Sequence, residues 1–242
     1  HGNHNPGVGG SSPSPATILF TLHVWAGTIG MKDLAALDVS ELQSVTAVLT
    51  DIDDTLTTHG RLPAVAYAAL EQLQAAGIKV VPITGRPAGW CDHIARMWPV
   101  DGVVGENGAF YFRYDTNAKR MNRVYAQDDA TRLANVKRLH ALADEVLQRF
   151  PGTAIASDQA YREIDVAIDF CEDVPALPLS TAQAIAEQFH HAGAEAKVSS
   201  IHVNAWFGDH NKLSMSLRML QECFGMSAAR AKTVEYFFRF HA

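Results

Sequence analysis

The chain has 242 residues, of which 48% are apolar and 19% are charged, and its net charge is −6. This length and apolar content are sufficient for one large core or two small ones. The acidic balance does not fit the basic surface of a nucleic-acid-binding protein, so an anionic ligand must be bound locally by a metal or a few donors. Cys91, Cys171 and Cys223 are widely spaced, which favours a reducing, cytoplasmic location with the thiols in the core.

The first 30 residues differ from the rest of the chain. They begin with a stretch rich in Gly, Ser, Pro and Asn, followed by a short apolar run from Ala16 to Ala26. A secretory signal needs a basic segment before its apolar run, but the first Lys or Arg here is Lys32. The run is also too short to cross a bilayer. We expect residues 1–30 to be a non-native or disordered extension, with a cryptic export signal as the alternative.

Strands and helices alternate in the next part of the chain. Residues 45–50 form an apolar, β-branched run that is typical of a strand buried on both faces. Helical spacing of apolar residues follows at 62–76 and 88–97, and further short strands are expected at 78–83 and 102–104. This order predicts an α/β fold with a parallel sheet. In such sheets a ligand binds beyond the carboxyl ends of the strands.

The middle of the chain has a different pattern. Two paired strands are expected here, then a long amphipathic helix and a half-buried strand at 163–170. Ser180 and Gln183 predict a capping box at the start of a second helix. We expect an inserted α+β unit, whose elements lie at 109–114, 120–125, 128–150, 163–170, 180–193, 196–199 and 202–207. A helix at 211–224 and the beginning of a strand at 231–234 follow it.

Polar side chains stand where the three predicted parallel strands end. Asp51 and Asp53 follow the first strand, Thr84 follows the second, and Asn107 follows the third. A carboxylate becomes a competent nucleophile when a cation lies beside it and water is excluded. A second carboxyl two residues away can deliver a proton to a leaving group. The pattern therefore indicates an enzyme site at this edge of the sheet.

Several stretches resemble motifs of the haloacid dehalogenase superfamily. Asp51-Ile52-Asp53-Asp54-Thr55 resembles the DxDx[TV] motif, and Ile83-Thr84-Gly85-Arg86-Pro87 resembles the second motif, a strand-terminal Thr or Ser that binds the phosphoryl group. Lys212 has the place of the family's lysine, at the start of the helix after the insertion. Asn107-Gly108-Ala109 resembles the NGA at the exit into the cap of subfamily IIB. The resemblance covers residues 45–234.

This resemblance implies a Rossmann-like core with a parallel sheet and an inserted α+β cap domain. The core would comprise residues 31–108 and 199–242, and the cap residues 109–198. The implied activity is an Mg²⁺-dependent phosphatase that hydrolyses a small phosphate monoester, a sugar or polyol phosphate, through an aspartyl-phosphate intermediate. Relatives with this plan include sucrose-phosphate phosphatase and mannosyl-3-phosphoglycerate phosphatase.

The resemblance also implies roles for individual residues. Asp51 would be the nucleophile and Asp53 the general acid and base, and both would hold Mg²⁺. Thr84 and Lys212 would stabilise the phosphoryl oxygens. Arg86 would either contact substrate or hold its own loop. The residues expected to bind substrate are Gly85, Arg86, Asn107 and Gly108.

In the expected cap, acidic side chains alternate along the strand at 163–170. Glu163, Asp165 and Asp169 lie on one face and are candidates to accept hydrogen bonds from sugar hydroxyls, or they form a solvated sheet face. The expected partner is a small phosphate ester, with no nucleic acid and no membrane, and the oligomeric state stays open. A surface role is expected for His59, which lies close to the catalytic loop.

The end of the chain departs from the family pattern. The fourth motif, a strand followed by GDxxND, supplies an aspartate to Mg²⁺, but here no acidic residue follows Glu235. We expect the chain to be truncated before this motif. Three hypotheses stay open: an active phosphatase, a phosphosugar mutase, and a catalytically impaired phosphosugar-binding domain. A mutase needs cations that face the site from the cap, and the candidates are Arg120, Arg123, Arg162 and Lys197.

Overall fold

The computed structural model describes residues 45–226 and the backbone of residues 233–236. The expected extension at 1–30 and the residues after Tyr236 lie outside the described residues. In the described part, every helix is too short or too polar to cross a membrane.

A parallel sheet forms the centre of the fold. Strand β1 (Ala47–Thr50) is buried along its whole length and pairs in parallel with β2 (Lys79–Pro82) on one side and β10 (Thr233–Tyr236) on the other. A parallel bridge from Ile83 to Val104 attaches a second group of strands to the edge of β2. That group is β3 (Val103–Gly105), β4 (Phe110–Asp115) and β5 (Arg120–Tyr125), paired antiparallel. We call β10-β1-β2 and β3-β4-β5 together the first sheet.

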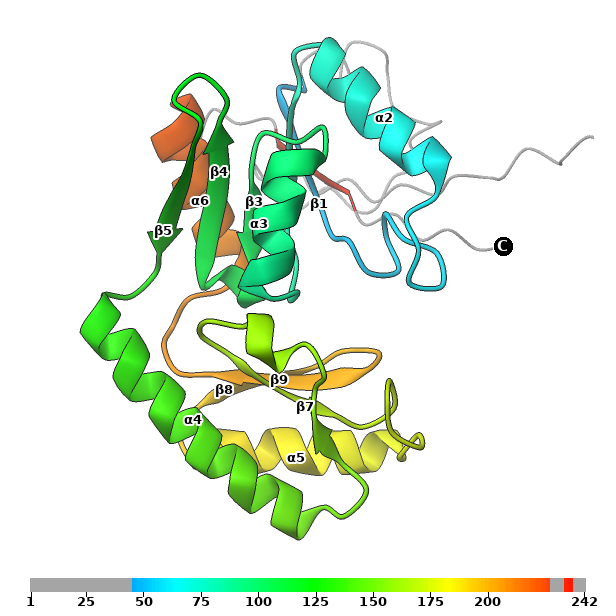
Figure 1. Ribbon diagram of the computed structural model, residues 1–242, viewed down its shortest axis with the longest axis vertical. Coiled ribbons are helices and arrows are strands. Elements are labelled where there is room, and N and C mark those ends of the chain that lie inside the picture. The colour runs from blue at the N-terminus through cyan, green and yellow to red at the C-terminus, as the bar shows by residue number, and fades with distance from the viewer. Residues whose placement is uncertain (1–44, 227–232, 237–242) are drawn as a thin grey trace, which may run out of the picture.

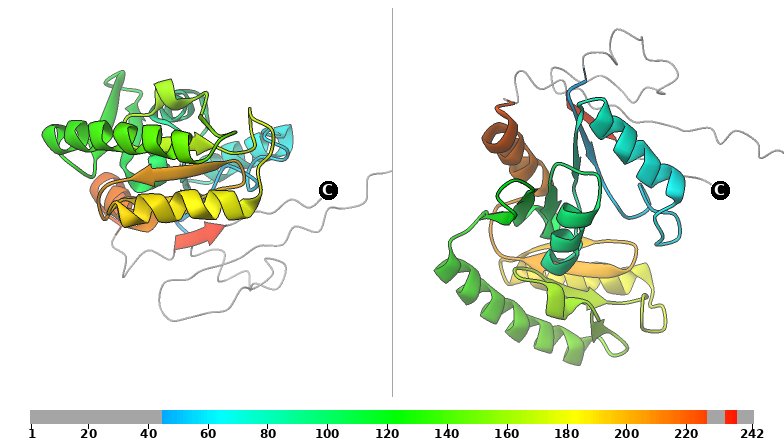
Figure 2. Two further views of the ribbon diagram at one scale, coloured as in Figure 1. Left: turned by 90° about the horizontal axis from the view of Figure 1, so that it is seen from below. Right: turned by 45° about the horizontal axis from the view of Figure 1, so that its top comes forward.

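Helices cover both faces of the first sheet (Figures 1 and 2). On one face, α2 (Ala64–Ala75) and α3 (Ala88–Met97) pack against side chains such as Val80 and Val103. On the other face, α6 (Lys212–Phe224) packs against Val81 and Val104. Because consecutive strand residues point to opposite faces, β1 and β3 need side chains that pack on both faces, and both strands are buried along their whole length.

A second sheet belongs to the inserted part of the chain. Its strand order is β6 (Ala154–Ile155), β7 (Val166–Asp169), β9 (His202–Trp206) and β8 (Glu195–Val198), all antiparallel. Helices α4 (Asp129–Arg149) and α5 (Leu179–His191) share one hydrophobic core with it. Figure 1 shows this sheet between those two helices and the first sheet. We call residues 129–206 the inserted unit.

The predicted α/β class is confirmed, but strand pairing divides the chain differently from the expected boundaries at 109 and 198. Strands β4 and β5 extend the first sheet, because the short 3₁₀ turn η2 (Glu106–Gly108) folds β4 back onto β3. Strand β9 pairs with β7 and β8, so residues 202–206 lie in the second sheet. The predicted capping box at Ser180 is also wrong, since α5 begins after Pro178 without a side-chain cap.

Gly108 allows η2 to approach the start of α6. Its φ is +100°, and a Cβ there would lie 2.2 Å from the carbonyl carbon of Asn211 and 2.7 Å from the amide nitrogen of Lys212. Only glycine tolerates both this backbone conformation and this contact. Gly108 therefore helps to place the first residue of α6 beside the carboxyl ends of the central strands.

Gly108→Ala is expected to lower the free energy of unfolding by more than the backbone strain alone, by about 2 kcal/mol or more in total. The control is Gly193→Ala, because Gly193 also has a positive φ, +78°, but has no atom within 4 Å of an added Cβ. Urea denaturation of the wild type and both variants measures the difference. Equal losses in the two variants would contradict a tight contact between η2 and α6.

Candidate active site

A cavity of about 550 Å³ lies between the carboxyl ends of the central strands and the inserted unit. Its wall is polar and contains residues from both parts of the protein. The first sheet and its loops contribute Asp51, Asp53, Asp54, Thr57, Gly60, Gly85, Arg86 and Asn107, and the start of α6 contributes Lys212. The inserted unit contributes Arg162, Glu172, Lys197, Val198, Ser199, Ser200, Ile201, His202 and Asn204.

Asp51 lies directly after β1 and has both carboxylate oxygens engaged. Its Oδ1 accepts a hydrogen bond of 2.7 Å from the backbone N–H of Ile52, and its Oδ2 accepts one of 2.6 Å from Nζ of Lys212. Lys212 is the first residue of α6, whose N-terminus is capped by the side chain of Asn211. The ammonium and the backbone amide therefore hold the Asp51 carboxylate in one orientation at the cavity wall.

Asp53 is paired with Arg86. The Nε of Arg86 lies 3.2 and 3.1 Å from the two carboxylate oxygens of Asp53, and its Nη2 lies 2.9 Å from Oδ1. The guanidinium also stacks over the ring of Trp90 at 4.6 Å. Burial alone would lower the pKa of Arg86, but the hydrogen bond to Asp53 raises it above its ordinary value. Of the two roles expected for Arg86, the structure shows contacts that hold the loop.

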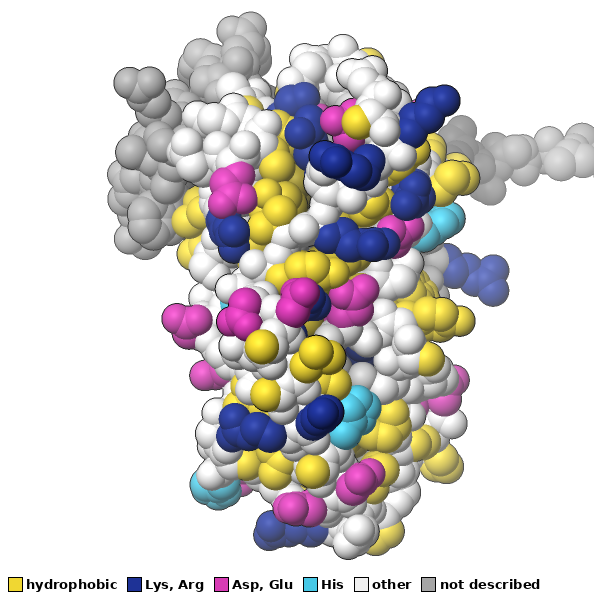
Figure 3. All heavy atoms as spheres, turned by 60° about the vertical axis from the view of Figure 1, so that its left-hand side comes forward, with side chains coloured by type: hydrophobic (Ala, Val, Ile, Leu, Met, Phe, Trp, Pro, Cys, Tyr) yellow, Lys and Arg dark blue, Asp and Glu magenta, His cyan; other side chains and the backbone are white. Residues whose placement is uncertain are grey.

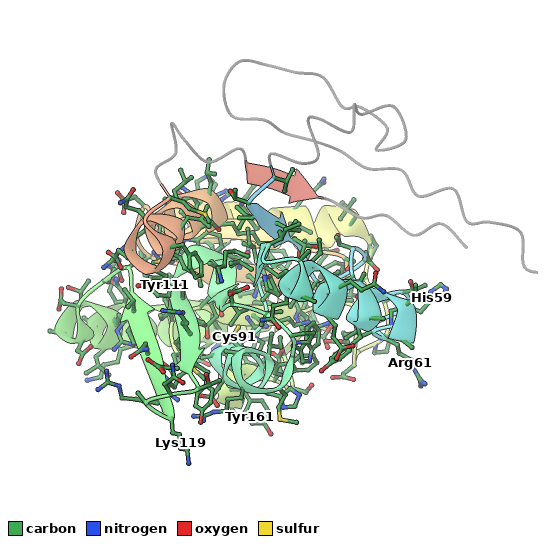
Figure 4. All side chains as sticks on the ribbon, turned by 90° about the horizontal axis from the view of Figure 1, so that it is seen from above. His59, Arg61, Cys91, Tyr111, Lys119 and Tyr161 are labelled. Atoms are coloured by element: carbon green, nitrogen blue, oxygen red, sulfur yellow. The ribbon has the colours of Figure 1, made fainter. Side chains whose placement is uncertain are left out.

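The loop after β1 turns sharply so that Asp51 and Asp53 both reach the cavity. The carbonyl of Ile52 accepts backbone N–H groups of the next turn and the hydroxyl of Thr57. Thr57 Oγ1 in turn accepts the backbone N–H of Asp54, which has a φ of +55°. His59 lies further out on this loop, outside the cavity wall, and Figure 4 shows it at the edge of the molecule, away from the buried Cys91.

Thr84 lies behind the cavity wall, and Asn107 lies in it. Thr84 is fully buried, and its hydroxyl accepts the backbone N–H of Arg86 at 3.0 Å. It is not part of the cavity wall, and neither is Gly108. Asn107 is in the wall, and its buried Nδ2 has no hydrogen-bond partner among the described residues. Gly85 packs against the Asn107 amide, which would lie 3.2 Å from an added Cβ.

Arg162 connects the inserted unit to the loop after β2. Its guanidinium is almost fully buried and pairs with Asp158 at 3.1 Å and with Asp165 at 2.9 Å. Its Nη1 also donates a hydrogen bond of 3.0 Å to the carbonyl of Gly85. Burial alone would lower the pKa of Arg162, but the two carboxylates raise it. The charge of this cavity residue is therefore neutralised within the inserted unit.

The acidic residues expected to accept hydrogen bonds from sugar hydroxyls have other partners in the structure. Asp165 binds Arg162 and Asn204, and Asp169 accepts three backbone N–H groups of the loop that follows it. Glu163 accepts a hydrogen bond of 2.6 Å from the hydroxyl of Tyr125. None of the three is in the cavity wall. The prediction that this strand is half-buried is also wrong, because all four residues of β7 are buried.

Residues that sequence reasoning missed form the wall on the side of the inserted unit. His202 is 3% exposed, and its Nε2 lies 2.8 Å from Oε2 of Glu172. Burial lowers the pKa of His202, and Glu172 opposes this shift. Ser199 and Asn204 lie nearby in the wall, together with Lys197, which the mutase hypothesis had named. Glu172 follows β7, the others come from β8, β9 and the turn between them, and none belongs to a recognisable motif.

The oxygen ligands available for Mg²⁺ are few. Among the described residues, no group of three or more His, Cys, Asp or Glu side chains could hold a metal ion. Mg²⁺ often binds through one or two carboxylates together with substrate phosphate and water. Asp51 and Asp53 satisfy this minimal set, although each is bound to a cationic side chain in the structure. The residues present therefore fit Mg²⁺ when a phosphate ester supplies further oxygens.

The loop that delivers Lys212 contains a buried histidine. His210 stacks on Trp206 with 5.9 Å between ring centroids, and neither ring nitrogen has a hydrogen-bond partner among the described residues. Burial lowers the pKa of His210 to about 4, which nearby Asp209 only partly opposes. The folded protein therefore holds this ring neutral at pH values at which an unfolded histidine, with a pKa of 6.5, is protonated.

This difference predicts a pH dependence of stability. At and above pH 7 the His210 ring is neutral in both the folded and the unfolded protein, so its contribution to the free energy of unfolding is fully present. This contribution is lost as the pH falls from 6.5 toward 4. Between pH 7.0 and 4.5 the free energy of unfolding of the wild type should therefore fall by about 2 kcal/mol more than that of His210→Phe. Urea denaturation of both proteins at pH 7.0 and 4.5 measures this, and parallel losses would contradict a neutral buried ring.

The chain is similar to known proteins in part of its sequence and in its fold. Residues 48–161 match the family model of haloacid dehalogenase-like hydrolases. A search of curated proteins found no match to the sequence. Among solved structures, a Thermoplasma acidophilum protein aligns with a TM-score of 0.58 and 14% identity, covering 76% of this chain and 73% of its own.

Two further structures share the fold. The sugar phosphatase BT4131 of subclass IIB aligns with a TM-score of 0.52 and 15% identity over 76% of this chain and 77% of its own. A haloacid dehalogenase-like hydrolase from Bacteroides thetaiotaomicron aligns with a TM-score of 0.52 and 15% identity, covering 75% of this chain and 78% of its own. At such identities the likeness concerns the fold. The family model therefore matches a little under half of the chain, and the solved structures show a shared fold.

Proposed function

We propose that this protein is an Mg²⁺-dependent phosphatase that hydrolyses a small phosphate monoester, a sugar or polyol phosphate, through an aspartyl-phosphate at Asp51. The observation that carries the proposal is the contact of 2.6 Å between Lys212 and Asp51 in the wall of a polar cavity. It combines a carboxylate nucleophile with a fixed cation at the carboxyl end of a central parallel strand, as phosphoryl transfer requires.

The first chemical step is an in-line attack. An oxygen of Asp51 forms a bond to phosphorus while the bond from phosphorus to the leaving alcohol breaks, and Asp53 gives its proton to that alcohol. Asp53 must first be released from the Arg86 pair and take up a proton from solvent, because both of its oxygens accept hydrogen bonds there. Water then attacks phosphorus, its proton goes to Asp53, and phosphate leaves with the Asp51 carboxylate restored.

The surrounding residues supply charge and donors for this step. Lys212 neutralises the equatorial phosphoryl oxygens, where charge spreads in the transition state. The unpartnered Nδ2 of Asn107 is a buried donor that a phosphoryl oxygen would satisfy. Thr84 acts from behind the wall, where it orders the Arg86 backbone. Held by the Asp51 carboxylate and the Asp53 backbone carbonyl, Mg²⁺ would supply further positive charge to the phosphoryl group.

The charges of the inserted unit favour hydrolysis over mutase activity. A mutase must retain a bisphosphate, so it needs free cations facing the site. Arg123 of β5 pairs with Asp92 of α3, and Arg162 pairs with Asp158 and Asp165 of its own unit. Neither Arg120 nor Arg123 is in the wall, whereas Lys197 is, together with the acidic Glu172. Release of free phosphate, without isomerised sugar phosphate, would support hydrolysis.

The size and chemistry of the cavity support a small polar substrate. A volume of about 550 Å³ lies within the usual range for small-molecule sites. BT4131, which shares the fold, is described as a sugar phosphatase. On the face drawn in Figure 3, acidic and basic side chains are mixed, which is consistent with the expectation of no nucleic-acid partner. We also propose a cytoplasmic location, with which three free cysteines are compatible.

Asp51→Asn is expected to reduce hydrolysis of an aryl phosphate in the presence of Mg²⁺ by about 10⁴-fold or more, because the amide cannot attack phosphorus. Phosphate release is the measurement. The matched control is Asp209→Asn, which makes the same change in an exposed loop residue outside the cavity. Activity that survives Asp51→Asn would refute the mechanism. Phosphate binding without turnover in the wild type would instead favour an impaired phosphosugar-binding domain.

His202→Phe is expected to lower kcat/KM for a sugar phosphate by about tenfold or more while changing aryl phosphate hydrolysis much less. The reason is that a substrate hydroxyl can accept from Nε2 of His202 and donate to Glu172. His191→Phe on the outer helix α5 is the control. Equal losses on both substrates would show that His202 does not read hydroxyl groups.

A further inference from the structure

Glu106 is a fully buried acid that the proposed chemistry does not use. It begins η2, directly before Asn107, and both residues have a positive φ, +41° and +57°. Non-glycine residues keep this backbone conformation only where their surroundings compensate for the strain. The compensation for Glu106 lies in its side chain, which contacts two separate parts of the protein.

The carboxylate of Glu106 accepts four backbone hydrogen bonds. Its Oε1 accepts the N–H groups of Ala88 and Glu163, each at 2.9 Å, and its Oε2 accepts those of Ile164 at 2.7 Å and Asp165 at 3.0 Å. Ala88 begins α3, where N–H groups lack partners within the helix and the helix dipole favours negative charge. The three consecutive N–H groups of residues 163–165 form a concave site for an anion.

These bonds join the two halves of the cavity wall. Glu106 and Ala88 belong to the first sheet and its helices, whereas residues 163–165 lead into β7 of the inserted unit. Residues 163–165 lie outside any helix or strand, so their N–H groups have no ladder partner. The neighbouring Arg162 adds one further bond across the same boundary, to the carbonyl of Gly85.

We infer that Glu106 is a positioning residue whose carboxylate latches the inserted unit onto the first sheet and thereby holds the two walls of the cavity together. Its two oxygens are both required. An amide in the same place can accept with only one oxygen, so two of the four buried N–H groups would lose their acceptor. The inference does not depend on which reaction the cavity supports.

Hydrogen exchange tests the latch without any substrate. In the wild type, the amides of Glu163, Ile164 and Asp165 should be protected like those of β1 and β2, although they lie in a loop. Glu106→Gln should speed their exchange by about tenfold or more, and that of Ala88 with them, while β1, β2 and the α4–α5 core keep their protection. The control is Asp129→Asn, which changes an 87% exposed acid of the inserted unit.

Three results would overturn the inference: fast exchange at residues 163–165 in the wild type, unchanged exchange there in folded Glu106→Gln, or an equal loss of protection over the whole chain. Glu106→Asp provides a second variant, judged by the same criteria if Glu106→Gln does not fold. Its shorter side chain keeps both acceptor oxygens but cannot reach Ala88 and residues 163–165 together. Because the readout is exchange, a failure of the proposed phosphatase activity would leave this test intact.

Discussion

The ion pair between Lys212 and Asp51 is the interaction on which the site depends, and it joins residues 161 positions apart. Asp51 directly follows β1, a parallel strand that is buried on both faces. Lys212 begins α6, which is held by the Asn211 cap and by the close approach of Gly108. The position of the pair is therefore a consequence of sheet order and helix packing.

Three cations of the cavity wall are paired with carboxylates before any substrate binds. Lys212 is paired with Asp51, Arg86 with Asp53, and Arg162 with Asp158 and Asp165. Such pairing avoids unpaired charge in a partly buried site. A phosphate ester would compete for Lys212 and Arg86 and leave the two aspartates free to act on it. The Nδ2 of Asn107, which has no hydrogen-bond partner among the described residues, would gain one without losing another.

Sequence reasoning succeeded where local pattern and element order decide the outcome. Asp51, Asp53 and Lys212 could be expected at one edge because each adjoins a strand end or helix start. It failed where long-range pairing decides: β4 and β9 could pair with either sheet, so the boundaries at 109 and 198 were wrong. Glu172 lies in a loop and His202 begins β9, and no motif marks either as a cavity residue. The burial of Asp165 depends on Arg162, which sequence alone does not place beside it.

The central claim is that Asp51 forms a covalent bond to phosphorus. The most direct measurement is to quench turnover of a phosphate ester with borohydride, which reduces an aspartyl-phosphate to homoserine, and to map the modified position by peptide mass spectrometry. The account predicts homoserine at position 51, dependent on substrate. Turnover with no modification there, or with modification at another acid, would contradict it.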